Sequence, residues 1–267
     1  MICKICNSAT SKIFRRNILS RYDIDYFQCS SCGFIQTEEP YWLKEAYHAP
    51  ITIEDTGIIK RNVLSAKRTS TILYFLFNKE GRFLDYGGGY GLFVRLMRDY
   101  GFDFYWTDPY TENLFARGFS FNSGSDVSIE LLTTFECFEH FTDPLHEIEK
   151  MLSISRSILF STDTFTSGTP NPEQWQYYYF SHGQHIALYS IASLKKIAEI
   201  FNLHLYSNGK SFHLLTPKVL SSTLFNVLLK SSLLGVPSII AMRMGSKTRF
   251  DSHATERRTN PLDQREK

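Results

Sequence analysis

An excess of charge of either sign is absent from this sequence of 267 residues: 29 lysines and arginines stand against 27 acidic residues, for a formal net charge of +2. This balance disfavours a dedicated nucleic-acid binder, so no nucleic-acid partner is expected despite a basic row between Lys12 and Arg21. A signal peptide is also missing, because Met1 to Cys6 leads directly into polar and charged residues. We therefore expect a cytoplasmic protein.

Cysteine is scarce, with five in the chain, yet four of the five form two pairs of identical spacing. The pairs are Cys3-x-x-Cys6 and Cys29-x-x-Cys32. Four thiolates at this spacing fit a closed tetrahedral zinc site, which is structural rather than catalytic and lets a short segment fold without a large core. Two disulfides are the alternative, which an intracellular location disfavours. We predict a zinc-ribbon-like module over residues 1–40.

Glycine is concentrated at one place. Residues 83–97 read FLDYGGGYGLFVRLM, a pattern that predicts a strand, a tight turn and the start of a helix. The glycines let the backbone approach a ligand closely, and the helix N-terminus offers unpaired N–H groups. A glycine-rich turn without a ligand is the alternative. The residues expected to face a cofactor here are Asp85, Gly87, Gly89 and Gly91.

Two phosphate-binding motifs are missing at this turn. The third glycine of G-x-G-x-x-G would fall on Leu92, and the Gly-Lys-Ser/Thr of a Walker loop does not follow. The next predicted strand, Phe102 to Trp106, is followed by Asp108, where a carboxylate can accept hydrogen bonds from two ribose hydroxyls. An Asp before a Pro is also common turn chemistry.

Strands and helices alternate along residues 81–217, which predicts an α/β fold with a Rossmann-like, doubly wound, mostly parallel sheet of seven strands. Further strands are expected near 118–121, at 129–135 and at 157–162, with helices at 57–78, 92–100, 145–152 and 191–201. A turn at Ser123 to Ser125 and a linker over 41–80 ending in the first helix complete this part. The sheet should close with an antiparallel hairpin at 203–206 and 212–215.

The register Asp-x-Gly-x-Gly-x-Gly resembles motif I of the class I S-adenosylmethionine (SAM) methyltransferases. The segment FECFEHFTDP at 135–144 resembles the one that follows strand four in the same superfamily. The resemblance implies that SAM is the cofactor and that Phe135 and Glu136 contact it together with the glycine loop and Asp108. It also implies that Glu139 and His140 order a loop rather than carry protons. The absent Asn/Asp-Pro-Pro-Tyr/Phe clamp disfavours methylation of bases or amines.

An aromatic insertion at 170–186 is expected beyond the C-terminal strand ends, beside the ligand crevice. Aromatic residues there can shape a dry pocket, and a histidine can take a proton near neutral pH. His185 is the first candidate for the base that activates a methyl acceptor and His182 the second, with Tyr179 beside them. A lid that merely packs on the sheet is the alternative.

The same insertion resembles the W-x-Y…(E/Q)-H-I stretch of zinc-binding-domain methyltransferases of polysaccharide and sugar-nucleotide pathways, including the sugar C-methyltransferases. The resemblance implies a sugar nucleotide or glycan as acceptor. The chain departs from it by having His182-Gly183-Gln184-His185 in place of Tyr-x-Glu-His and by lacking a further C-terminal domain, so O-methylation is at least as well supported as C-methylation. An RNA methyltransferase and a non-catalytic zinc-ribbon interaction protein are the alternative functions.

Residues 218–245 are rich in leucine, with Lys230 and Pro237 interrupting the apolar run. A lysine near the bilayer centre costs roughly 2.5–3.5 kcal/mol, and proline breaks a helix, so a membrane span is disfavoured. We expect one or two helices at 219–242 that contact the domain, a second subunit or the inner membrane surface. The charged residues 246–267 should form a loosely ordered polar tail.

Overall fold

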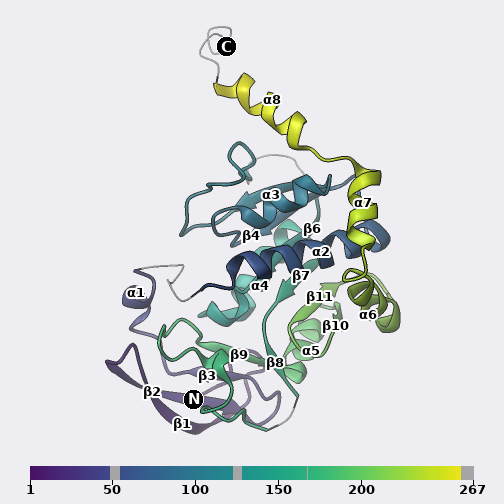
Figure 1. The fold of residues 1–267 in the computed structure, drawn as a ribbon. Helices are drawn as coiled ribbons and strands as arrows, with labels where there is room; N and C mark the ends of the chain where they lie inside the picture. Colours follow the sequence, from purple (N-terminus) through teal and green to yellow (C-terminus); the bar gives the residue numbers. More distant parts are fainter. Residues whose placement is uncertain (49–54, 123–127, 167, 260–267) are drawn as a thin grey trace. The chain divides into compact units, whose positions relative to one another are not determined.

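The computed structural model describes residues 1–48, 55–122, 128–166 and 168–259, and gives no side-chain burial for 256–259 (Figure 1). The linker at 49–54, the predicted turn at Ser123 to Ser125 and the tail beyond 259 lie outside the described residues. The chain divides into two compact units, each built from two separate stretches. Unit 1 holds Met1–Asp55 and Thr134–Ser222, and unit 2 holds Thr56–Thr133 and Thr223–Lys267.

Unit 2 contains three parallel strands. β4 (Arg82–Tyr86) lies between β5 (Asp103–Thr107) and β6 (Ile129–Phe135), both parallel to it. β6 is the strand through which the chain passes into unit 1. The strands are built from apolar runs, and rings of β4 and β5 stack at their centre, with Phe83 and Phe104 centroids 5.2 Å apart. This packing places the polar ends of the strands at one edge.

Helices α2 (Ile58–Leu76) and α3 (Leu92–Asp99) pack against one another in unit 2 (Figure 1). They confirm the two helices expected on either side of the first strand. α7 (Val236–Met244) packs on α2 and follows α6 (Ser222–Ser231) at an angle of 86°. Among the described residues, no single helix is long and apolar enough to cross a membrane, while the bent α6–α7 pair passes that test by length and composition.

The expectation of a loosely ordered tail is wrong for its first half. Residues Thr248–Thr259 form helix α8. Its Asp251 is 3% exposed and accepts two hydrogen bonds of 2.8 Å from Arg98 Nε and Nη2 on α3. Arg98 also donates to Asp103 and stacks over Phe119, with its guanidinium 3.6 Å from the ring centroid. The charged residues of this segment indicated disorder, but one of them, Asp251, forms a buried ion pair that attaches α8 to α3.

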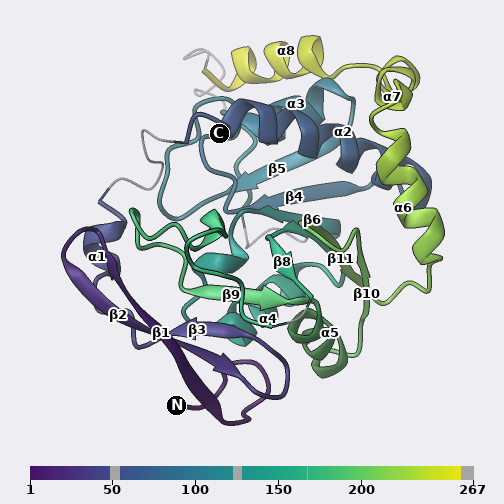
Figure 2. The ribbon, with the colours of Figure 1, turned by 60° about the horizontal axis from the view of Figure 1, so that its bottom comes forward.

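Unit 1 contains a five-stranded sheet that joins the N-terminal strands to the later insertion (Figure 2). Its members, in spatial order, are β1 (Thr10–Ile18), β2 (Tyr22–Cys29), β3 (Ile35–Thr37), β9 (Ala187–Ser190) and β8 (Thr164–Phe165). β3 and β9 are antiparallel, with Ile35 opposite Leu188. The N-terminal strands are thus extended by β9 and β8, which lie much later in the chain.

The remaining strands of unit 1 include the predicted terminal hairpin. β10 (His204–Ser207) and β11 (Phe212–Thr216) are antiparallel, and β11 is antiparallel to β7 (Ile158–Ser161). Two helices of this unit are capped by side chains: Asp143 caps α4 (Pro144–Ile154) and Ser190 caps α5 (Ile191–Ile200). The hairpin and both helices confirm the predicted elements.

Among the described residues, the sheet that contains β6 has six strands in the order β10-β11-β7-β6-β4-β5, rather than seven, and it is mixed. The segment expected as a strand at 118–121 makes a single parallel bridge, between Trp106 and Ser120. Gly118 has a positive φ of 85°, which interrupts the extended backbone that a strand requires. The predicted strand at 118–121 was therefore wrong, because the apolar residues there follow a glycine with a positive φ.

Candidate active site

The glycine turn joins β4 to α3 within unit 2. The N–H groups of Gly87 and Gly88 both donate to the carbonyl of Thr107, at 2.9 and 3.2 Å. A Cβ atom on Gly88 would lie 2.7 Å from Cδ1 of Trp106, so no larger residue fits. Gly91 is the N-cap of α3 at a φ of 83° and brings no capping side chain. The turn therefore leaves the start of α3 open to an external acceptor.

Asp85 is the buried carboxylate at the end of β4. It is 3% exposed, and Thr133 Oγ1 on β6 donates to its Oδ1 at 2.7 Å. Burial raises the pKa of Asp85 from 3.8 to about 7, the Thr133 hydrogen bond opposes that rise, and the charge of Asp108 adds to it. A carboxylate that remains buried at the end of a strand, although burial disfavours its charge, is available to a polar ligand.

Asp108 binds the glycine turn directly. Its Oδ2 accepts the N–H of Gly89 at 2.9 Å, and its Oδ1 accepts the N–H groups of Tyr110 and Thr111 at 2.7 and 2.9 Å. The Gly89 carbonyl in turn accepts from Trp106 Nε1 and Thr111 Oγ1, both at 2.8 Å. Asp108 therefore shapes the turn in addition to the ribose contact predicted for it, which stays a prediction.

Phe135 and Glu136, the other two residues predicted to contact the cofactor, belong to unit 1. Phe135 stacks on Phe212, with centroids 5.7 Å apart. Glu136 has a positive φ of 54°, and its N–H donates to Ser161 Oγ at 2.9 Å. A non-glycine residue in this conformation marks a sharp turn directly after β6. Their predicted contact with the cofactor is not tested by these observations.

The three residues predicted to be catalytic lie close together in unit 1. The ring of Tyr179 is 5.3 Å from that of His182 and 5.1 Å from that of His185, centroid to centroid. Tyr179 is 46% exposed and takes a left-handed backbone with φ 44°. His185 is partly buried, and its Nδ1 lies 2.6 Å from the Tyr177 carbonyl. Burial lowers the pKa of His185 well below 6.5, so the ring is neutral at pH 7.

Glu139 and His140 join His185 in one cluster, which sequence reasoning did not assemble. One ligand atom from each of the three residues lies within 4.8 Å of the other two. Burial raises the pKa of Glu139 well above its usual value and lowers that of His140 to about 4. The resemblance implies that Glu139 and His140 order a loop. His140 and His185 lie 45 positions apart in the sequence, so no local pattern indicated that they meet.

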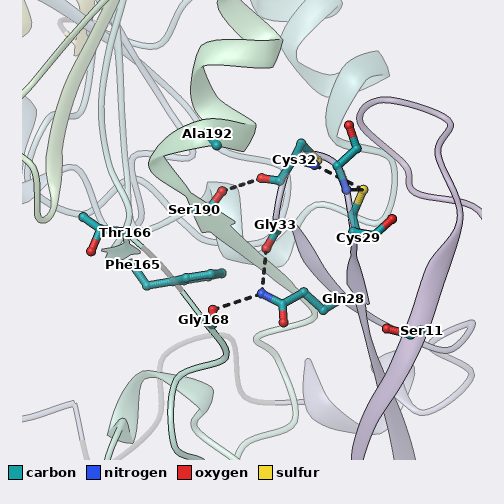
Figure 3. Close-up of a pocket in the computed structure, with 12 residues that line it drawn as sticks. Ser11, Gln28, Cys29, Cys32, Gly33, Phe165, Thr166, Gly168, Ser190 and Ala192 are labelled. Atoms are coloured by element: carbon teal, nitrogen blue, oxygen red, sulfur yellow. Dashed lines mark hydrogen bonds between the residues drawn. The ribbon is translucent and has the colours of Figure 1, made fainter.

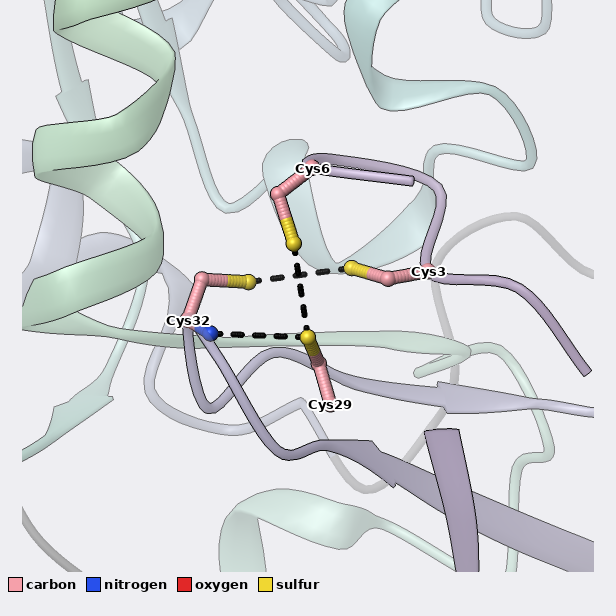
Figure 4. A group of neighbouring side chains, drawn as sticks. All are labelled: Cys3, Cys6, Cys29 and Cys32. Atoms are coloured by element: carbon pink, nitrogen blue, oxygen red, sulfur yellow. Dashed lines mark hydrogen bonds between the residues drawn. The ribbon is translucent and has the colours of Figure 1, made fainter. Parts of the chain in front are cut away.

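The four predicted metal ligands converge in unit 1 (Figure 4). The sulfurs of Cys3 and Cys32 are 3.6 Å apart and those of Cys6 and Cys29 3.4 Å apart, with all four within 4.8 Å. Tetrahedral zinc with Zn–S bonds of about 2.3 Å requires sulfurs under 4 Å apart. Backbone N–H groups of Ser31 and Cys32 also point at Cys29 Sγ, each at 3.4 Å, as suits a thiolate.

The buried side-chain amide of Gln36 fixes the backbone on both sides of Cys3. Gln36, on β3, accepts the N–H of Lys4 and donates to the carbonyl of Ile2, both at 2.9 Å. The hydrogen bond with Cys32 lowers the pKa of Cys3 to about 5, and the same bond raises that of Cys32. Protons shared between sulfurs in this way are what a divalent cation displaces.

A polar cavity of about 360 Å³ adjoins the second cysteine pair (Figure 3). Gln28 reaches across it, donating from Nε2 to the carbonyls of Gly33 and Gly168 at 3.3 and 3.1 Å. Ser190 on its wall donates to the Cys32 carbonyl at 2.6 Å. Because none of the predicted catalytic residues lines this cavity, we do not assign the methyl acceptor to it.

Each cation of the basic row between the cysteine pairs forms an ion pair with a carboxylate. Lys12 and Arg15 both contact Asp25 Oδ1 at 2.8 Å. Arg16 pairs with Glu173, and Arg21 with Glu45 at 3.1 Å. The row is therefore part of a face of mixed charge.

A sequence model of the family described as a methyltransferase domain matches residues 61–208, more than half of the chain. The matched range includes the glycine turn, Asp108 and the Glu139–His140–His185 cluster. No curated protein matches the sequence significantly.

Several solved structures are similar to the chain at low identity. An O-methyltransferase family protein from Burkholderia thailandensis gives a TM-score of 0.48 and 10% identity, over 67% of this chain and 64% of that one. Human N-acetylserotonin methyltransferase in complex with SAM gives 0.43 and 13%, over 68% and 60%. Magnesium protoporphyrin IX methyltransferase from Synechocystis with bound SAH gives 0.43 and 12%, over 65% and 92%. The chain spans less than two thirds of the length of the first two.

Proposed function

We propose, from the premise that this chain belongs to the methyltransferase-domain family, that it methylates a hydroxyl of a sugar nucleotide or glycan intermediate. The chain is a SAM-dependent methyltransferase. The observation that carries the cofactor assignment is the glycine turn, closed to side chains at Gly88 and uncapped at the start of α3, with the buried Asp85 at the end of β4. These groups suit a cofactor that carries both amino-acid and ribose functions.

The residues around the turn fit SAM by their chemistry. Asp85 offers a carboxylate to a cationic or hydroxyl group, Asp108 offers one to the ribose hydroxyls, and α3 offers N–H groups to a carboxylate. SAM supplies an electrophilic methyl group on a sulfonium. Asp85 and Asp108 bind and orient it, and the side chains of the buried strands exclude water from the sheet beneath.

The chemistry needs one acceptor and one proton sink. A lone pair of the acceptor oxygen forms the new O–CH3 bond while the S–CH3 bond breaks and its electron pair stays on sulfur. The hydroxyl proton must leave, and His185 is the residue that we propose activates the hydroxyl. Its Nδ1 is held by the Tyr177 carbonyl, which leaves Nε2 as the free nitrogen.

The sugar class is proposed from the aromatic surface near His185. Tyr179 presents an exposed ring beside His182 and His185, and an amphipathic ring of this kind can contact an apolar sugar face while its hydroxyl hydrogen-bonds. The paired charges of the basic row give no support to RNA as acceptor. The resemblance of the 170–186 segment to sugar-pathway methyltransferases supports the same class.

The four cysteines are proposed to hold a structural zinc ion. Their sulfur separations suit tetrahedral coordination, and four protein ligands leave no position for substrate. Zinc would link Cys3 and Cys6 to Cys29 and Cys32 at the end of β2. It would thereby stabilise β3, the strand that pairs with β9. The predicted contact of residues 219–242 with a second subunit or a membrane surface stays a prediction. The exposed apolar side chains there are Val219, Leu224, Val227, Leu233, Leu234, Ile239 and Met242.

The test is a transfer screen with methyl-labelled SAM against sugar nucleotides, lipid-linked glycans and RNA. We expect label in a sugar nucleotide or glycan, as an ether that mild acid treatment does not release from the sugar. Asp85→Ala should abolish SAM binding measured by calorimetry, while Glu149→Ala, at an exposed carboxylate on α4, should leave it unchanged. Label in RNA alone, or SAM affinity indifferent to Asp85→Ala, would overturn the proposal.

A further inference from the structure

The Glu139–His140–His185 cluster brings together two segments of unit 1 that are far apart in sequence. Glu139 and His140 lie on the short 3-10 helix after β6 (Phe138–His140), and His185 lies just before β9. The N–H of Ile186 donates to the Glu139 carbonyl at 2.9 Å, which pins the two segments together. The rings of His140 and His185 are 5.0 Å apart and nearly perpendicular, at 88°.

Both imidazoles are oriented by backbone carbonyls. Nδ1 of His140 lies 3.2 Å from the Gln184 carbonyl, and Nδ1 of His185 lies 2.6 Å from the Tyr177 carbonyl. A carbonyl oxygen only accepts hydrogen bonds, so each Nδ1 carries the proton of a neutral ring and each Nε2 keeps a lone pair. This arrangement, with Nδ1 anchored to a carbonyl and the lone pair left on Nε2, is how histidines are held when they bind metals.

Glu139 completes the donor set with a carboxylate that has no partner. Its side chain is 0% exposed, and neither Oε1 nor Oε2 makes a hydrogen bond. The nearby hydroxyls of Thr162 and Tyr177 hydrogen-bond to one another at 3.1 Å, and the hydroxyl that accepts this bond keeps a proton directed at the Glu139 side chain from beyond hydrogen-bond distance. None of the ion pairs among the described residues includes Glu139. An isolated buried carboxylate is strongly disfavoured, whereas a cation at this point would satisfy it.

We propose that Glu139, His140 and His185 bind a divalent transition-metal ion, through one carboxylate oxygen and two Nε2 atoms, separate from the four-cysteine site. Two imidazoles and one carboxylate suit first-row ions and leave coordination positions open for water or a hydroxyl. The catalytic consequence rests on the proposed function: an acceptor hydroxyl bound to the ion would lose its proton to water more readily, so His185 would activate the hydroxyl as a ligand of the ion and would not itself take the proton at Nε2.

The experiment measures Mn²⁺ binding by electron paramagnetic resonance, because immobilised Mn²⁺ loses the signal of the free ion. The full chain is freed of metal with a chelator and given one equivalent of Zn²⁺, which the four thiolates take in preference to Mn²⁺. We expect the wild type to bind one Mn²⁺ per chain. Glu139→Gln and His185→Ala should each weaken binding at least about tenfold, and His204→Ala, at an exposed histidine of β10, should not.

Glu139→Gln keeps the shape of the side chain, so it decides the test if His185→Ala does not fold by circular dichroism. Failure of the wild type to bind Mn²⁺, equal binding by Glu139→Gln, or equal loss in His204→Ala would overturn the metal site. None of these outcomes touches the methyl-transfer proposal, which fails instead if label from SAM reaches no sugar or glycan.

Discussion

Asp85→Asn should make the unfolding free energy of the ligand-free protein less dependent on pH. The folded chain raises the pKa of Asp85 from 3.8 to about 7, chiefly by burial. For an acid whose pKa is raised, stability is fully present below pH 3.8 and is lost as pH climbs towards 7. Asparagine keeps an oxygen to accept the Thr133 hydrogen bond but carries no charge at any pH.

The magnitude follows from the size of the shift. A displacement of about 3 pKa units corresponds to about 4 kcal/mol once Asp85 is fully ionised, at about 1.4 kcal/mol per unit. Roughly 2–3 kcal/mol of this falls between about pH 5 and pH 8.5, because part of the loss is complete by pH 5. Other titrating groups are common to both proteins and cancel in the difference.

Urea unfolding of both proteins at the two pH values, followed by circular dichroism, gives the difference directly. We expect the unfolding free energy of Asp85→Asn, relative to that of the wild type, to rise by roughly 2–3 kcal/mol between about pH 5 and pH 8.5. Thr133→Val, which removes the hydrogen bond that favours the charged form, should widen the pH dependence of a protein that retains Asp85. A difference between wild type and Asp85→Asn that stays constant with pH would refute the burial argument.

Three further changes have defined outcomes. Gly88→Val places a side chain against the indole of Trp106 and the carboxylate of Asp85. Calorimetry should then show SAM affinity falling at least about tenfold, or about 1.4 kcal/mol. Unchanged affinity would contradict the cofactor site. Asp251→Ala leaves the buried Arg98 short of two hydrogen bonds and should lower the unfolding free energy by about 3 kcal/mol; a loss below about 0.5 kcal/mol would mean that α8 does not hold in solution. Cys29→Ser should reduce bound zinc, measured by mass spectrometry of the metal, while Cys137→Ser should not; equal zinc in both would exclude the four-cysteine site.

Elements made from contiguous residues were predicted closely. The strand predicted at 129–135 is β6, Ile129–Phe135, and the predicted hairpin is β10–β11. Both follow from apolar runs bounded by turn residues, a signal that acts within a few positions. The glycine turn was also recognisable, because its tight backbone requires glycine at neighbouring positions.

Features that depend on distant partners were missed. Helix α8 has a composition typical of a solvated tail, and the buried pair of Asp251 with Arg98, 153 residues away, decides its structure. The pairing of β3 with β9 also escaped prediction, because neither strand carries a mark of its neighbour. Propensity describes how a segment behaves alone, and tertiary burial overrides it in such cases.

The sequence by itself determined the family, the position of the glycine turn and the spacing of the four cysteines, since each depends on residues close together in the chain. Only the tertiary structure decided that His185 lies beside Glu139 and His140, with Nδ1 of both histidines held by backbone carbonyls and no hydrogen bond to either carboxylate oxygen of Glu139. The reason is physical: the orientation of a histidine ring is set by which carbonyl its other nitrogen meets, and that carbonyl is placed by the packing of the whole unit.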